Sequence, residues 1–166
     1  PAELVQSVVR ETANLINDSD LHLTYLALSV VLSIISKFPS ATGALEADVV
    51  PRAIELASSA LLQGQALRAL IQLFQELAVT NTGRLTLDNL LQELLHNAMN
   101  RQELPKQAVS NLAKCIAGLC VKASEDKRNS MVQVFINDLH SPEERRKHLA
   151  LLCIGELGQQ ADLSAA

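Results

Sequence analysis

Apolar residues recur every three or four positions along most of the chain, and the pattern is densest between Leu62 and Val79. Two adjacent stripes of that stretch are apolar: Leu62, Ala66, Leu70, Leu73 and Leu77, then Leu67, Ile71, Phe74 and Ala78. This spacing predicts an α-helix with only a narrow polar stripe. A surface helix normally buries one face, so a helix that is apolar on two faces needs neighbours on both sides, as in the middle of a stack.

Seven further segments show the same helical period, and short polar turns separate them. The expected helices cover residues 2–17, 21–38, 42–59, 62–79, 87–99, 105–123, 127–139 and 142–158. Asp20 and Ser141 supply N-cap side chains, and Pro105 suits a first turn. Pro51 either kinks the third helix or opens its second half. The tail from Gln159 to Ala166 shows no clear element.

These helices form pairs, and the second helix of each pair aligns with the others at steps of 39, 42 and 41 residues. Three positions match across the four units: Ala27, Ala66, Ala108 and Leu149; Val31, Leu70, Leu112 and Cys153; Ile35, Phe74, Ile116 and Leu157. A period near 40 residues is typical of HEAT and armadillo units. We therefore predict an all-α fold, an α-solenoid of about four antiparallel HEAT-type pairs (2–38, 42–79, 87–123 and 127–158) in one segment, 1–166. The alternative is a compact bundle, in which each helix needs only one apolar face.

Composition supports this class. Apolar residues make up 48% of the chain but aromatic residues only 2%, so the core must consist mainly of Leu, Ile, Val and Ala. The net charge of −4 argues against a nucleic-acid partner, which would need a basic face, and no apolar run is long enough for a membrane span. The chain begins with Pro1 rather than Met, and we expect it to be a fragment of a longer protein.

No catalytic or metal-binding pattern is apparent. Cys115 and Cys120 are five residues apart, without the spacing of a zinc ribbon, and the third cysteine, Cys153, also lies in an apolar pattern. The histidines (His22, His96, His140 and His148) are scattered. We expect buried structural thiols in a reducing compartment, glycines that allow close helix contact, and no metal, cofactor or small-molecule substrate. The cluster from Glu143 to Lys147 is either a contact patch or, the favoured interpretation, a solvated first turn with internal ion pairs.

The best candidate for partner binding is the polar stripe of the second helices. One layer of helices usually lines the concave surface of a solenoid, where partners bind. The aligned polar positions are Ser29, Ser33, Arg68, Gln72, Ser110 and Lys114. Together they predict a mildly basic ridge on an acidic protein; a solvated ridge without a partner is the alternative for any one residue. In the fourth repeat these positions are Leu151 and Gly155, which predicts a covered face there.

Several short stretches resemble the cullin-associated, neddylation-dissociated protein family, and Gln63-Gly64, Lys114 and the Gly-Glu-x-Gly pattern that begins at Gly155 count most because stacking does not require them. They include Gln63-Gly64 with Ala66-Leu67, Phe74-Gln75 and Val79-Thr80; Ala113 to Ala117; Leu149 to Leu152 with Gly155-Glu156 and Gly158; and Asp162 to Ser164. The likeness runs from about Leu4 to Ser164 and is weak between Ala41 and Ser59. It implies a segment of the C-terminal half of a long HEAT-repeat protein of the cytoplasm and nucleus.

The resemblance also implies a function. The family wraps around unmodified cullin–RING ligase cores and competes with substrate-receptor adaptors, so this chain is expected to be a non-enzymatic scaffold with a protein partner. Two alternatives remain open: another HEAT or armadillo scaffold, such as a nuclear transport receptor or a phosphatase scaffold, or a helical accessory domain of an enzyme.

Overall fold

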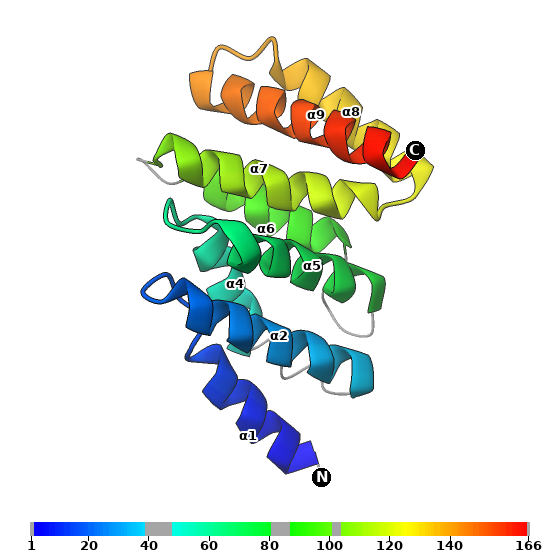
Figure 1. Cartoon of the computed structure of the whole chain (residues 1–166). Coiled ribbons are helices and arrows are strands. Elements are labelled where there is room, and N and C mark those ends of the chain that lie inside the picture. Colours follow the sequence, from blue (N-terminus) through cyan, green and yellow to red (C-terminus); the bar gives the residue numbers. More distant parts are fainter. Residues whose placement is uncertain (1, 39–47, 81–86, 101–103, 166) are drawn as a thin grey trace.

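The computed structural model describes residues 2–38, 48–80, 87–100 and 104–165, and these form eight helices without a strand. The helices are α1 (Ala2–Ala13), α2 (Leu21–Lys37), α4 (Val50–Ala57), α5 (Gly64–Thr80), α6 (Leu87–Asn100), α7 (Lys106–Val121), α8 (Glu125–Asp138) and α9 (Glu144–Ala165). They stack in chain order from the N-terminus to the C-terminus (Figure 1). The predicted all-α solenoid is confirmed.

The stack has two layers. Helices α2, α5, α7 and α9 lie side by side in one layer, and each packs against the next (Figure 1). Helices α4, α6 and α8 lie behind them, and α1 lies at the N-terminal end against α2. The second helices of the predicted pairs therefore form one continuous layer, while the assignment of residues 1–166 to one repeat segment stays a prediction.

The repeat register is reproduced in the core. All twelve aligned side chains are at most 6% exposed. They are Ala27, Val31 and Ile35 on α2; Ala66, Leu70 and Phe74 on α5; Ala108, Leu112 and Ile116 on α7; and Leu149, Cys153 and Leu157 on α9. They belong to one continuous apolar cluster, apart from Ala108, which is buried outside it. The spacing of the sequence pattern thus sets which face of each second helix is buried.

Two of the four residues predicted to start helices, Asp20 and Pro51, have the expected role. The Asp20 carboxylate caps α2 by accepting a hydrogen bond from the Leu23 N–H at 3.0 Å. The predicted Ser141 cap was wrong, because α9 begins only at Glu144 and the Ser141 hydroxyl accepts from the Glu143 N–H, at 3.2 Å, before the helix. Pro51 lies in the first turn of α4, so of its two alternatives the helix start is confirmed. Pro105 occupies the N-cap position of α7, with a ψ of 151°, and not the predicted first turn.

Other boundaries differ from prediction. Helix α1 ends at Ala13, before Asn17, because the N–H of Leu15 turns to the carbonyl of Thr12. Helix α8 begins at Glu125 because the Ser124 hydroxyl caps it by accepting from the Lys127 N–H.

The prediction for the tail was wrong, since α9 continues from Gly158 to Ala165. Residues 159–165 contain neither glycine nor proline, and an interior Gly158 weakens a helix without ending it. Residues 42–47 of the expected third helix lie outside the described residues.

The expected role of the glycines holds at one position. A Cβ on Gly118 would lie 2.7 Å from Ile71 Cγ2, so this glycine allows α7 to approach α5 closely. At Gly155 and Gly158 no described atom lies within 4 Å of a Cβ, so the expectation was wrong there. Gly64, at the start of α5, has φ of +61°, a conformation that favours glycine.

Candidate partner-binding surface

The predicted ridge lies on three consecutive helices of one layer. Ser29 and Ser33 are on α2, Arg68 and Gln72 on α5, and Ser110 and Lys114 on α7, and these helices pack in that order (Figure 1). Ser33, Arg68 and Gln72 are exposed, whereas Ser29, Ser110 and Lys114 are half-buried. The structure therefore places the six residues at equivalent positions of neighbouring helices.

The chemistry of the ridge is carried by its two cations. Neither Arg68 nor Lys114 forms an ion pair with another described residue. The Ser29 hydroxyl donates to the Tyr25 carbonyl of its own helix at 3.0 Å and contributes less to an outside contact. Arg68, Gln72 and Lys114 are the members best suited to bind acidic or amide groups of a protein surface.

The ridge becomes apolar on α9. Leu151, at the position equivalent to Arg68, is 58% exposed, and Gly155 is also exposed. The sequence pattern predicts that another part of the protein covers Leu151 and Gly155, but no described residue does so. An exposed leucine beside a glycine leaves a flat apolar surface next to the polar part of the ridge.

The charge cluster at the start of α9 has internal ion pairs, as the solvated interpretation expects. Arg146 lies 3.3 Å from Glu143 and 3.7 Å from Asp138, and Lys147 lies 3.5 Å from Glu144. These pairs are largely exposed, and exposed pairs add little to stability.

The three thiols are buried and unsuited to nucleophilic chemistry at neutral pH. Burial raises the pKa of Cys115 from 9.0 to about 12. Burial also raises the pKa of Cys120 to about 11, against the lowering effect of Lys127 and Arg128. The pKa of Cys153 is raised mainly by burial and further by nearby negative charge. Because the thiolate is the reactive form, these are structural cysteines.

The part of the chain that the structure describes holds no group of three or more His, Cys, Asp or Glu residues able to bind a metal ion. His22, His96 and His140 are exposed on separate helices and turns, and His148 is half-buried on α9. None of the described helices combines the length and the apolar character needed to cross a bilayer.

Two structurally important polar residues were missed. The Asn111 amide, which is fully buried, donates to the carbonyls of Ser59 and Leu62 at 2.9 Å. The Arg128 guanidinium donates to the carbonyls of Cys120, Val121 and Ala123 at 3.0 to 3.3 Å, at the end of α7. The sequence did contain a signal for Asn111. At the equivalent positions α2 and α5 have the apolar residues Val30 and Ala69, so a polar residue there is unusual.

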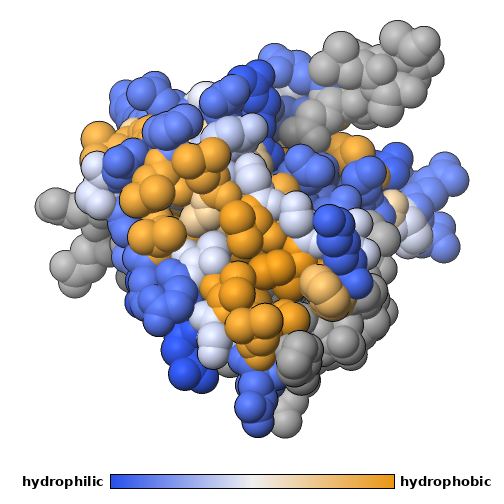
Figure 2. All heavy atoms as spheres, turned by 60° about the horizontal axis from the view of Figure 1, so that its bottom comes forward, coloured by the Kyte–Doolittle hydropathy of each residue, from blue (hydrophilic) through white to orange (hydrophobic). Residues whose placement is uncertain are grey.

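A second surface, at the N-terminal end of the stack, is apolar (Figure 2). Its exposed side chains on and beside α1 and α2 are Leu4, Val8, Leu15, Leu23, Leu26, Val30 and Phe38, each 40–62% exposed. On and just before α5, the positions equivalent to Leu23 and Val30 are Leu62 and Ala69, which are buried. The end of the stack therefore exposes positions that inner pairs bury against a neighbour.

Comparison with known proteins gives relatives over nearly the whole chain. No protein-family model matches it. The chain is 34% identical over 171 residues to the cullin-associated NEDD8-dissociated protein 1 of Arabidopsis thaliana, covering 99% of this chain and 14% of the relative. The proteins of the same name from Dictyostelium discoideum and Drosophila melanogaster are each 29% identical over 98% and 99% of this chain, respectively. The chain spans 14% of the length of these relatives.

Proposed function

Because this chain is homologous over nearly its whole length to one segment of the cullin-associated NEDD8-dissociated proteins, we propose that it is part of a non-enzymatic scaffold that associates with cullins. The observation that carries the proposal is this similarity, with relatives named for cullin association matching 98–99% of the chain. The extended layer of second helices supports it, since stacked repeats bind proteins over broad surfaces.

The detailed mechanism that we propose is steric. The parent protein sequesters unmodified cullin–RING ubiquitin ligase cores and competes with substrate-receptor adaptors, so that adaptors exchange. No bond is made or broken. Its partners are proteins rather than nucleic acids, membranes or small molecules, and it acts in the cytoplasm and nucleus. The binding surface extends over successive repeats.

Within this segment, the ridge of Arg68, Gln72 and Lys114 is the proposed contact surface. Its side chains can change without loss of the core, because they lie beside the buried register positions rather than among them. The remaining ridge positions, Ser29, Ser33 and Ser110, would line the same surface.

The test uses the full-length protein immobilised as bait, with purified cullin–RING core as prey, either unmodified or conjugated to its ubiquitin-like modifier. Retention of the unmodified core alone, and its release by added adaptor, is the expected result. Equal retention of both forms would contradict the sequestration mechanism. Retention of a transport cargo or a phosphatase subunit without any cullin would contradict the proposed partner itself.

A further inference from the structure

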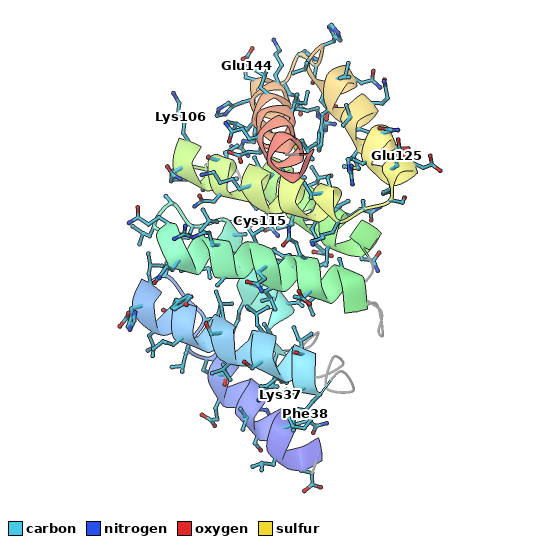
Figure 3. All side chains as sticks on the ribbon, turned by 45° about the vertical axis from the view of Figure 1, so that its right-hand side comes forward. Lys37, Phe38, Lys106, Cys115, Glu125 and Glu144 are labelled. Atoms are coloured by element: carbon cyan, nitrogen blue, oxygen red, sulfur yellow. The ribbon has the colours of Figure 1, made fainter. Side chains whose placement is uncertain are left out.

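An open groove lies between the N-terminal ends of α7 and α9, outside the ridge defined above. Its volume is about 430 Å³. The apolar lining residues are Leu104, Val109 and Leu151, and the polar ones are Lys106, Glu144, Arg145, Lys147 and His148. Figure 3 shows the starts of the two helices, where Lys106 and Glu144 are labelled, on the same side of the stack.

The rim of the groove has the opposite charge from the protein as a whole. Lys106, Arg145 and Lys147 are cations, and Glu144 is the one carboxylate among the lining residues. Lys147 lies 3.5 Å from Glu144, which offsets one positive charge, and Lys106 leaves the rim net positive without any contribution from Arg145. The whole chain has a net charge of −4. A cationic rim on an acidic protein favours a ligand that carries carboxylates.

The floor of the groove is an exposed apolar surface. Leu151 is 58% exposed, although equivalent positions on the other second helices are Ser29, Arg68 and Ser110. A leucine at this solvent-facing position gains nothing for the core, whereas an apolar centre inside a polar rim is the usual anatomy of a protein interface.

The position of the groove argues against a neighbouring repeat as its occupant. Leu151 shares the groove with Leu104, Lys106 and Val109, which belong to α7 and the residues just before it. A following helix pair would pack on the side of α8 and α9 that faces away from α7. The groove opens instead within the layer of second helices, the same layer that carries the ridge.

From these observations we propose that the groove binds an acidic, amphipathic segment of a protein partner. One apolar side chain of that segment packs on Leu151 and the half-buried Leu104, and carboxylates on either side of it face Lys106 and Lys147. The proposal rests on the function proposed above only in taking the partner to be a protein, and its test does not require that partner to be a cullin.

The first arm of the test measures affinity with the full-length protein and its captured partner complex. Lys106→Glu and Leu151→Asp should each weaken binding by about tenfold or more, because each adds negative charge where carboxylates bind. Matched controls are Lys122→Glu, exposed at the far end of α7, and Val134→Asp, 45% exposed on α8. The controls should leave affinity unchanged, and unchanged affinity in the groove variants too would overturn the proposal.

The second arm identifies the occupant. A photo-crosslinking amino acid replaces Leu151 in the full-length protein in cells, and the crosslinked peptide is sequenced. The expected peptide comes from another protein, has carboxylates flanking an apolar residue, and is lost when Lys106→Glu is added. A crosslink to this protein's own chain, to a second copy, or to a neutral or basic segment would overturn the proposal. An acidic segment of a non-cullin protein would support the groove as well, whereas the proposed cullin association is decided by the retention experiment described above.

Discussion

The side-chain amide of Asn111 donates a 2.9 Å hydrogen bond to the backbone carbonyl of Leu62, a residue 49 positions earlier. The same amide nitrogen bonds the Ser59 carbonyl, also at 2.9 Å, and its carbonyl oxygen accepts from the Gln107 amide at 3.1 Å. One buried side chain on α7 thus supplies the hydrogen-bond donor for two backbone carbonyls of the turn before α5. A buried carbonyl without a partner costs free energy, so this contact fixes how the two second helices are placed.

Replacing Asn111 with leucine should therefore lower the free energy of unfolding by about 1–3 kcal/mol, since two carbonyls lose their donor. Urea unfolding followed by circular dichroism measures the change. Asn137→Leu, at an exposed position of α8, is the control and should have a much smaller effect. Similar losses in both variants would show that the Asn111 hydrogen bonds contribute nothing specific.

The close approach at Gly118 makes a second prediction. Gly118→Ala places a Cβ 2.7 Å from Ile71 Cγ2 and should lower stability by about 1–3 kcal/mol through overpacking. Adding Ile71→Ala should make the alanine at 118 less harmful, which a double-mutant cycle would detect as coupling.

Gly155 provides the matched control for that substitution. No described atom lies within 4 Å of its Cβ position, and it lies inside α9, so Gly155→Ala should raise stability by up to about 1 kcal/mol. Thermal unfolding of Gly118→Ala and Gly155→Ala under the same conditions measures the two opposite changes in stability. Destabilisation by both would mean that glycine is required in these helices for a reason other than space.

The buried thiols predict how stability depends on pH. Burial raises the pKa of Cys115 from 9.0 to about 12 and that of Cys120 to about 11, so above pH 9 the unfolded chain loses protons that the folded chain keeps. Their contribution to stability is complete below pH 9 and is lost as pH rises from about 9 to about 12. Urea unfolding at pH 8, 9 and 10, with a Cys115→Ala and Cys120→Ala double variant as reference, measures it. If the free energy of unfolding of the double variant fell with pH as steeply as that of the unchanged protein, the two thiols would not be the cause.

Charge reversal tests the ridge. Arg68→Glu combined with Lys114→Glu should weaken partner binding by about tenfold or more while the melting temperature stays nearly constant, because Arg68 is exposed and Lys114 half-buried. Lys37→Glu with Lys122→Glu, both exposed, is a control of equal charge. Unchanged affinity in the ridge variant would remove these residues from the interface, and a lower melting temperature in it would show a role in folding.

Periodicity was enough to predict which face of each second helix is buried, as Ala27, Ala66 and Ala108 show, because the spacing of apolar residues reports burial directly. One cap and one proline gave helix starts for the same local reason. The end of α9 could not be predicted, since residues 159–165 carry no stop signal and no strong pattern.

Contacts between distant residues were beyond this reasoning. Nothing local to Asn111 indicates that it bonds Leu62, and nothing local to Lys106 indicates that it shares a groove with Leu151, because both relations depend on how neighbouring helices are placed. The six ridge residues could be assigned to one layer from the period alone, whereas their partner could come only from homology.

The apolar surface at the N-terminal end, which includes Leu26 and Val30, has a consequence for the order in which the stack opens. Repeats in a stack gain stability from the interface with each neighbour, so a pair with one interface solvated is less protected than a pair with two. In residues 1–166 studied alone, amide hydrogens of α1 and α2 should therefore exchange before those of α5 and α7, and a repeat packed on this surface in a longer chain should slow that exchange.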